Sequence, residues 1–187
     1  RYHWKLRAEI FWLNRIARSC CGPAKPTARG QPVESAQHGF YLAPSLTDLA
    51  WPARLAIAAA LAVWETARDF LPEQSCQIKW PNDLLLNGKK LGGILTEMET
   101  ESDRIRHVVV GLGLNVNNPG FPPELAATAT SLSLAAGRTF SRVNLLQAWL
   151  EEFEELYGRF LAREFAGILE EWRSFAVTLE KRLPMRS

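Results

Sequence analysis

The chain has 187 residues, of which 47% are hydrophobic and 22% charged, as is ordinary for one folded domain with its own core. A net charge of +2, without a basic run interleaved with aromatic residues, gives no indication of nucleic-acid binding. The three cysteines form no CxxC pair and there are only three histidines, so neither a disulfide framework nor a metal site is predicted. This usage favours the reducing cytoplasm.

The ends of the chain and its apolar runs bear on targeting. The sequence begins at Arg1 without a methionine and shows no signal-peptide pattern, which is consistent with a fragment. Its most apolar run, residues 55–64, is far shorter than the roughly 20 residues that cross a bilayer. We therefore expect this run in a core and no membrane partner.

Residues 1–44 carry the weakest pattern, with a helix expected around residues 9–18 and a short strand at residues 39–42. The pattern then becomes regular. Thr47 or Asp48 can cap a helix from about residue 49 to residue 70, with Pro52 in the first turn, where a missing N–H costs little. Its small and aliphatic residues are expected to pack on a sheet: Leu55, Ala59, Ala62 and Val63.

Residues 77–80 alternate polar and apolar, which predicts a half-buried strand with Ile78 and Trp80 on one face and Lys79 on the other. Pro81 ends this strand. Asn87-Gly88 then lies between two strand-like runs and predicts a hairpin, because a type I′ turn needs positive φ at both central positions. Counting outward from the turn gives three expected pairs: Leu86 with Lys89, Leu84 with Leu91, and Asn82 with Gly93.

Two glycines, Gly92 and Gly93, stand in the returning strand, where glycine marks a bulge or the close approach of a ligand. Lys79, Asn82 and Asp83 are then expected beside backbone that carries no side chains. A small flat molecule could lie there. The alternative is an ordinary exposed hairpin with a solvated lysine.

Residues 97–103 are predicted to form an acidic, solvated loop, and residues 106–111 a buried strand that leads to Asn115 and Asn117. Asparagine amides both donate and accept hydrogen bonds, so they suit the edge of a purine ring. The alternative is that both asparagines only close a turn.

Two helices are expected in the remaining chain, after a rigid loop at residues 119–123. Ser141 is predicted to cap the first helix, and the second runs over about residues 165–175. Apolar residues recur at helical spacing and are expected to face the core: Leu145, Leu146, Trp149, Phe153, Leu156, Phe160 and Leu161 in the first, Ile168, Leu169 and Trp172 in the second.

Four motifs, in this order, resemble those of the biotin protein ligase catalytic domain. They are Lys-Trp-Pro-Asn-Asp from residue 79, Lys-Leu-Gly-Gly-Ile-Leu from residue 90, Gly-Leu-Gly-Leu-Asn-Val-Asn from residue 111 and Ala-Thr-Ser-Leu from residue 129. The resemblance implies an α+β fold: a mixed, mostly antiparallel sheet with helices on one face and ligands on the other. Residues 1–178 would form the catalytic domain, with 1–45 atypical, and residues 179–187 the start of a truncated SH3-like module.

The same resemblance implies a two-step reaction: biotin and ATP give biotinyl-5′-AMP, and a lysine of a biotin carboxyl-carrier domain of a carboxylase then takes the acyl group. Mg²⁺ is expected to neutralise the phosphates. Lys79 is the expected catalytic cation. The resemblance implies substrate contacts from Asn14, Arg29, Gly30, Lys79, Gly92 and Gly93, and nucleotide contacts from Arg29, Asn82, Asp83 and Asn115.

The N-terminal part departs from the family. Only Asn14 remains of a Ser-Thr-Asn triplet that hydrogen-bonds biotin, and Arg29-Gly30 is a remnant of a phosphate-binding loop. A polyphosphate needs several N–H groups and guanidinium donors, so Arg29 is alternatively a plain surface arginine. A deletion or reading-frame error before Gly39 is one hypothesis, which resequencing would test.

Three functions therefore remain open from the sequence: a biotin protein ligase, a non-catalytic remnant with a defective phosphate loop, and a lipoate or octanoate ligase of the same fold. The sequence also leaves open the acceptor protein, a homodimer formed through a sheet edge, and an upstream DNA-binding module.

Overall fold

The computed structural model describes residues 35–42, 51–101 and 104–177. Within them, five strands form one sheet in the order β1-β5-β4-β3-β2, and each neighbouring pair is antiparallel. The elements are β1 Ser35–Leu42, α2 Trp51–Phe70, β2 Cys76–Lys79, β3 Asp83–Leu86, β4 Lys89–Glu101, β5 Arg104–Asn115, α3 Pro123–Ala126, α4 Leu132–Ala136, α5 Arg142–Leu161 and α6 Phe165–Phe175.

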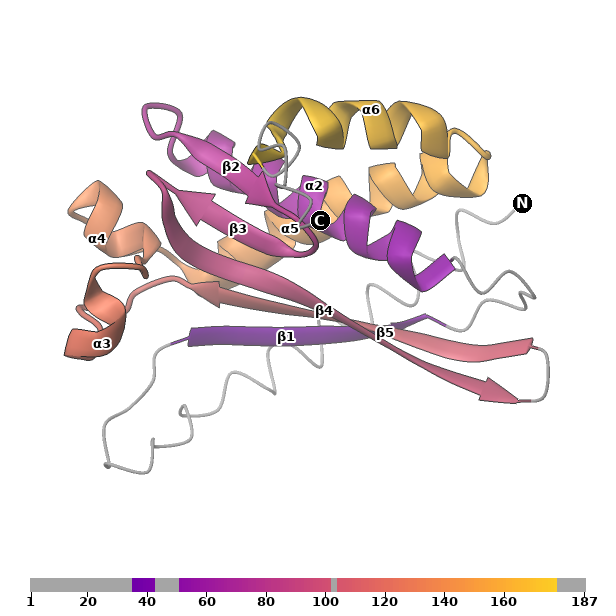
Figure 1. Cartoon of the computed structure of the whole chain (residues 1–187), viewed down its shortest axis with the longest axis horizontal. Coiled ribbons are helices and arrows are strands. Elements are labelled where there is room, and N and C mark those ends of the chain that lie inside the picture. The colour runs from indigo at the N-terminus through magenta and orange to yellow at the C-terminus, as the bar shows by residue number, and fades with distance from the viewer. Residues whose placement is uncertain (1–34, 43–50, 102–103, 178–187) are drawn as a thin grey trace, which may run out of the picture.

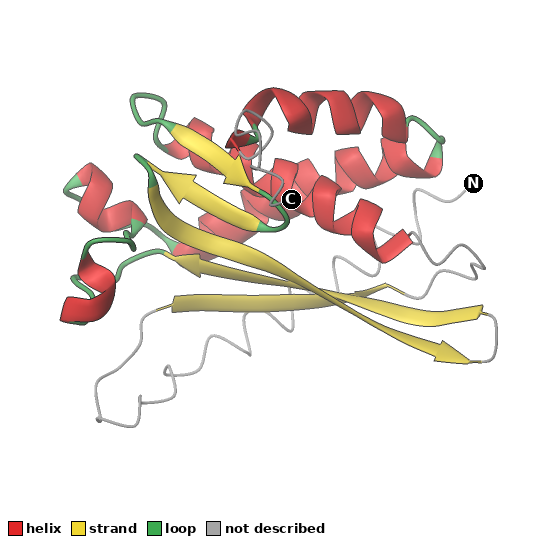
Figure 2. Cartoon of the chain, viewed as in Figure 1, coloured by secondary structure: helices red, strands yellow, loops and turns green. Residues whose placement is uncertain are grey.

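The long helices α2, α5 and α6 lie together on one side of the sheet, and the short α3 and α4 lie at one end of it (Figure 1; Figure 2). This confirms the predicted α+β fold with helices on one face. Parallel pairing in the described residues is limited to two isolated bridges, between Ile78 and Ala176 and between Lys90 and Ala129.

The helix α2 packs closely on the sheet because small side chains line its inner face. Leu55, Ala59 and Ala62 are fully buried, as the sequence predicted. Pro52 lies in the first turn, where no intrahelical N–H bond is lost. The predicted caps Thr47 and Asp48 lie outside the described residues.

The helices α5 and α6 also form as predicted. The hydroxyl of Ser141 accepts a hydrogen bond from the Asn144 N–H and caps α5. Trp149 and Phe153 are buried and α5 packs on α2, while Ile168 and Trp172 are buried on α6, which packs on both α2 and α5. The prediction was wrong for Leu161, which is 45% exposed because it is the last residue of α5 and lies past the packed stripe.

The hairpin turn is confirmed, but its register is not. Asn87 and Gly88 have φ of 52° and 76°, as a type I′ turn requires. Leu86 pairs with Lys89 as expected. Beyond a bulge, however, the pairs are Leu85 with Lys90, Leu84 with Gly92, and Asp83 with Gly93. Leu91 is the extra residue, and counting outward from a turn cannot detect it.

Two further expectations about strands were wrong. β2 ends at Lys79, so its alternation does not extend to Trp80, which is 58% exposed while Ile78 is fully buried. The residues expected as an acidic loop continue β4 up to Glu101 and pair with β5. The side chains of residues 97–101 are nevertheless exposed, and from Glu99 onward this end of β4 and β5 extends beyond the last pair with β1, Leu42 with Val108 (Figure 1).

Three carboxyl groups meet where α2, α5 and α6 pack together. Burial, followed by the hydrogen bond and charge of Glu152, raises the pKa of Glu65 to about 7. Glu171 raises this pKa further and Arg68 lowers it. Arg159 offsets part of the cluster through a bidentate pair with Glu171, with N–O distances of 2.8 and 3.0 Å.

The cluster predicts a pH dependence of stability. The pKa of Glu65 lies above its ordinary value of 4.5 in the folded state, so the folded state binds more protons and stability falls as pH rises from about 4.5 to about 7. Glu65→Gln is therefore expected to gain stability relative to the parent over that window and to keep a constant advantage above it. Urea unfolding at a series of pH values measures this, and a parallel pair of curves would contradict it.

Candidate functional site

The strand register aligns one residue from each strand across the sheet. Lys79 pairs with Asp83, Asp83 with Gly93, Gly93 with Gly113, and Gly113 with Gln37. Paired residues point to the same face of a sheet. The chain neighbours Ile78, Leu84 and Ile94 are buried under the helices, so this row lies on the opposite face, which none of the described helices covers and which we call the open face.

Glycines occupy the middle of this open face. Gly93 lies opposite Gly113, and two residues along β5, Gly111 lies opposite both Leu95 and Gly39. A Cβ atom added at Gly113 would meet only the Gly93 carbonyl oxygen, at 3.9 Å. We call Gly93, Gly111 and Gly113 the glycine floor. It presents bare backbone to a ligand, with Leu95, 60% exposed, beside it.

Gly92 does not belong to this floor. It pairs with Leu84 and Leu114, both buried, and therefore points toward the helices. An added Cβ would lie 2.4 Å from the Gly113 carbonyl oxygen, which is closer than any real contact. Gly92 is thus required for close packing of β4 on β5, and its predicted contact with substrate stays a prediction for its backbone only.

A lysine that the sequence did not single out lies over the floor. The Nζ atom of Lys90 is 2.6 Å from an Asp83 carboxylate oxygen and 3.9 Å from the position of a Cβ on Gly93. The bulge at Leu91 is the cause, because it puts Lys90 and Gly93 on the same face although they are three positions apart in the chain. Lys79, the predicted cation, is an exposed residue at the end of the same row.

Asn82 is held by the sheet. Its carbonyl oxygen accepts the Ile94 N–H at 2.8 Å, and its Nδ2 donates to the Ile94 carbonyl at 2.5 Å. These bonds fix the turn between β2 and β3, and hence Asp83 directly after it. A nucleotide contact by Asn82 or Asp83 stays a prediction.

The two asparagines after β5 have different surroundings. Asn117 donates to the Phe140 carbonyl and accepts the Phe140 N–H, both at 2.9 Å, so its amide closes a loop, as one alternative held. Asn115 donates from Nδ2 to the Thr130 carbonyl at 3.1 Å. It stands at the end of β5, in the column of open-face residues that contains Gly111 and Gly113. Its nucleotide contact stays a prediction, and Asn14, Arg29 and Gly30 lie outside the described residues.

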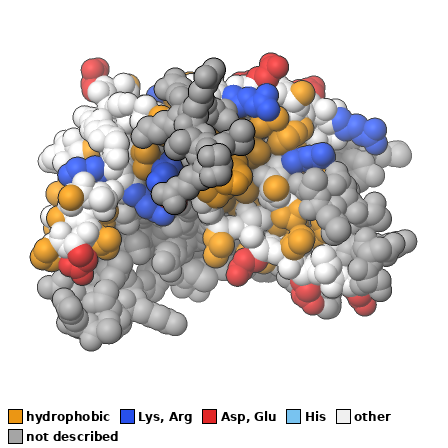
Figure 3. Space-filling model, viewed as in Figure 1, with side chains coloured by type: hydrophobic (Ala, Val, Ile, Leu, Met, Phe, Trp, Pro, Cys, Tyr) orange, Lys and Arg blue, Asp and Glu red, His pale blue; other side chains and the backbone are white. Residues whose placement is uncertain are grey.

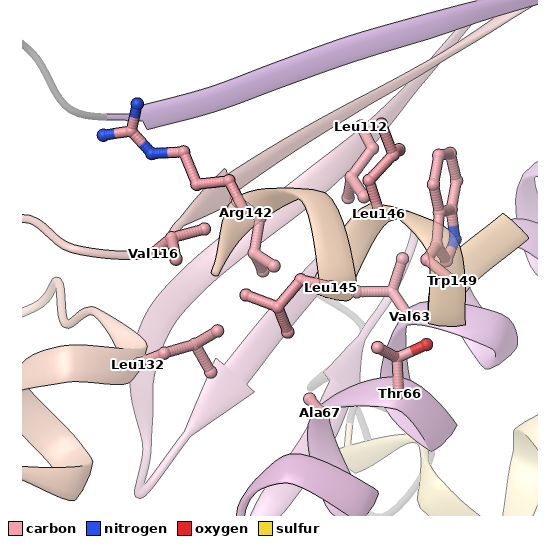
Figure 4. Close-up of a pocket in the computed structure, with 11 residues that line it drawn as sticks. Val63, Thr66, Ala67, Leu112, Val116, Leu132, Arg142, Leu145, Leu146 and Trp149 are labelled. Carbon is pink, nitrogen blue, oxygen red and sulfur yellow. The ribbon is translucent and has the colours of Figure 1, made fainter. Parts of the chain in front are cut away.

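An apolar cavity lies on the other side of the sheet, between β5 and the helices α2, α4 and α5 (Figure 4). Leu145, Trp149 and Val63 line it, and the guanidinium group of Arg142 extends away from it (Figure 4). Thr66 supplies a hydroxyl, but that group already donates to the Ala62 carbonyl. Such walls offer little to orient an acid or a nucleotide, so we place the candidate site on the glycine floor.

Charge on the molecular surface is mixed. On the face seen in Figure 3, the Lys and Arg side chains of the described residues are scattered among hydrophobic ones. Among the described residues, no group of three or more His, Cys, Asp or Glu side chains is placed to hold a metal ion. None of the described helices has the length and hydrophobicity needed to span a bilayer.

Comparison with known proteins agrees with this fold. Residues 45–115 match the Biotin/lipoate A/B protein ligase family. The matched segment includes β2, β3, β4 and all of β5, and over it the chain is similar to this family.

Individual relatives show which kind of ligase the chain is similar to. The bifunctional ligase/repressor BirA of Bacillus subtilis is 42% identical over 136 residues, which are 72% of this chain and 42% of that protein. The biotin–[acetyl-CoA-carboxylase] ligase of Paracoccus denitrificans is 31% identical over 144 residues, or 72% of this chain and 58% of that protein. The chain thus spans about half the length of these relatives.

Solved structures show the same fold. The biotin protein ligase of Aquifex aeolicus superposes with a TM-score of 0.69 at 25% identity, over 79% of this chain and 62% of that one. The same enzyme in complex with biotin and ATP gives a TM-score of 0.66 at 26% identity, over 79% and 60% of the two chains.

The glycines provide a direct test of the floor. Gly113→Val places a branched side chain over open space in a strand, so we expect the melting temperature to change little and small-molecule binding to the floor to be lost. Gly92→Ala forces β4 from β5 and is expected to cost about 1–3 kcal/mol of stability. Gly120→Ala, with no atom within 4 Å of its Cβ, is the neutral control.

Thermal unfolding and calorimetric titration with biotin separate these outcomes. If Gly113→Val bound biotin as tightly as the parent chain, the floor would not be the ligand site.

Proposed function

We propose that the chain is the catalytic part of an ATP-dependent biotin protein ligase, which activates biotin as biotinyl-5′-AMP and transfers the acyl group to a lysine of a carrier domain. The match of residues 45–115 to the ligase family supports this proposal, as do relatives named for biotin ligation and a related structure in complex with biotin and ATP. The observation that carries it is local: an ammonium group over bare backbone on the open face.

The first step joins two anions. A biotin carboxylate oxygen attacks the α-phosphorus of ATP, a carboxyl–phosphate bond forms, and the bond to the β-phosphate breaks as pyrophosphate leaves. Negative charge grows on oxygens around the phosphorus. A fixed cation about 4 Å away is worth on the order of 4 kcal/mol at an effective dielectric constant near 20, which is roughly a thousandfold in rate.

We assign this role to Lys90. Its ammonium group is held by Asp83 above the position where a Gly93 side chain would begin, so a carboxylate lying on the floor would meet it. Lys79 follows in the same row, two strands from Gly93, or about 10 Å between Cα atoms. The catalytic role predicted for Lys79 stays a prediction and is tested beside that of Lys90.

Three lysine variants separate these assignments. Lys90→Ala is expected to lower pyrophosphate release with biotin and ATP by about a thousandfold, because the charge over the floor is lost. Lys89→Ala is the matched control, since the Lys89 Nζ donates to the Ala126 carbonyl at 3.3 Å, away from the floor. Loss of activity in Lys79→Ala with full activity in Lys90→Ala would return the role to Lys79.

The nucleotide is expected to lie toward Asn115, Asn82 and Asp83. Asn14, Arg29 and Gly30, which lie outside the described residues, stay predicted contacts of the substrates. Mg²⁺ is proposed as the ion that ATP brings with its phosphates. The described residues offer no carboxylate set for it, since Asp83 is already paired with Lys90. We therefore assign the ion no protein ligand and no step.

The second step takes place on an acyl phosphate. The neutral amine of an acceptor lysine attacks the acyl carbon, an amide bond forms, and AMP leaves with the former carboxyl oxygen. We propose a carboxylase carrier domain as the acceptor, as the name of the Paracoccus relative indicates for that protein. We propose the cytoplasm as the location, where such carriers and ATP occur together.

Ligand specificity separates the proposal from its alternatives. We expect calorimetry to show biotin binding that tightens when a non-hydrolysable ATP analogue is present, and an excess of lipoate to leave biotin adenylation unchanged. Lipoate adenylation that displaces biotin would favour the lipoate or octanoate ligase. Absence of binding by either acid would favour the non-catalytic remnant.

A further inference from the structure

A short segment after α3 grips the backbone of Lys90. Residues 128–130, Thr128-Ala129-Thr130, which we call the strap, run parallel to the start of β4 and form an isolated bridge with it. The Lys90 N–H donates to the Thr128 carbonyl at 2.7 Å, and the Thr130 N–H donates to the Lys90 carbonyl at 2.9 Å. Both backbone polar groups of Lys90 are therefore bonded to the strap.

The strap also holds Asn115. The Thr130 carbonyl accepts a hydrogen bond from the Asn115 Nδ2 at 3.1 Å. Thr130 thus bonds through its N–H to the residue with the cation over the floor, and through its carbonyl to the amide of Asn115, which lies one residue beyond the Gly92–Leu114 pair at the same end of the sheet. One residue fixes the spacing between them.

Both ends of the strap are anchored. On one side, the Ala129 N–H donates to the Leu125 carbonyl of α3 at 2.8 Å. On the other, Ser131 is fully buried, and its hydroxyl donates to the Asn118 carbonyl at 2.8 Å while accepting the Leu134 N–H of α4. With its backbone fixed before and after Thr130, the strap can hold Lys90 in one place.

The bulge explains why the hydrogen bonds from the strap matter for the position of Lys90. The regular pairing of β4 with β3 is interrupted at Leu91. Lys90 lies directly before this bulge, near the start of β4. Its side chain reaches from there to Asp83 and the floor, so a small shift of its backbone displaces the ammonium group. A displacement of about 1 Å at a reacting centre can cost about a hundredfold in rate.

We propose that the strap is a positioning element of the adenylation site, and that Thr130 acts through the backbone of Lys90 and the amide of Asn115. This inference rests on the proposed ligase function for its effect on rate, but not for its effect on the Lys90 backbone. Thr130 is a positioning residue and need not touch either substrate.

The test removes one hydrogen-bond donor. Thr130→Pro deletes the N–H that donates to Lys90, whereas Ala129→Pro, the matched control, deletes an N–H that donates to Leu125 and leaves both bonds to Lys90. We expect Thr130→Pro to lower the rate constant of biotin adenylation tenfold or more, with little change in the KM for biotin, and Ala129→Pro to have a much smaller effect.

A double-mutant cycle separates positioning from general damage. Because Thr130 acts through Lys90, Thr130→Pro is expected to cost less than twofold when introduced into Lys90→Ala. An equal loss in both backgrounds, or an equal loss in Ala129→Pro, would overturn the proposal. If Thr130→Pro does not fold, an amide-to-ester replacement at position 130 removes only that N–H and enters the same cycle.

A readout that needs no activity keeps the two proposals distinct. Hydrogen exchange of the Lys90 amide is expected to be faster in the Thr130 variant than in the parent chain and unchanged in Ala129→Pro. Should the parent chain form no adenylate, the proposed function fails and the exchange measurement still decides whether the strap holds Lys90. If both the adenylation rate and the exchange rate of the Lys90 amide were unchanged in the Thr130 variant, the role of the strap would be refuted and the proposed function would stand.

Discussion

One constraint organises this structure: helices cover a single face of the sheet. Because α2, α5 and α6 bury one side of the sheet, each pair of strand residues points either to the packed face or to the open face (Figure 1). Branched and aliphatic residues take the packed face. On the open face the pairing aligns Lys79, Asp83, Gly93 and Gly113, and the two glycines leave the backbone accessible.

The position of Lys90 follows from a local exception to that alternation. In a regular strand Lys90 and Gly93 would point to opposite faces, and the bulge at Leu91 brings them to the same one. The ion pair with Asp83 is partly exposed, 52% for the lysine and 25% for the carboxylate, so its contribution to stability is small, about 0–1 kcal/mol. The ion pair matters instead for the orientation of the Lys90 side chain, because it holds the ammonium group beside the floor.

Local signals in the sequence predicted much of the fold. The Asn87-Gly88 turn, the Ser141 cap and the periodic helices each depend on neighbouring residues and form as expected. The bulge at Leu91 leaves no mark in the hairpin pattern, so a count from the turn gave a wrong register and placed Lys90 on the face away from Gly93. Lys90 opens the Lys-Leu-Gly-Gly motif, and that was the available signal.

The central claim is that an acid and a nucleotide are joined on the open face, over the glycine floor and against the Lys90 ammonium group. A crystal structure of this chain with a non-hydrolysable analogue of biotinyl-5′-AMP tests it most directly. We expect the acyl–phosphate linkage within about 4 Å of the Lys90 Nζ and above Gly93 and Gly113, since a charge contact of that length is what the rate argument requires. An analogue bound in the apolar cavity between α2 and α5, or an ammonium group turned away from the linkage, would contradict the account.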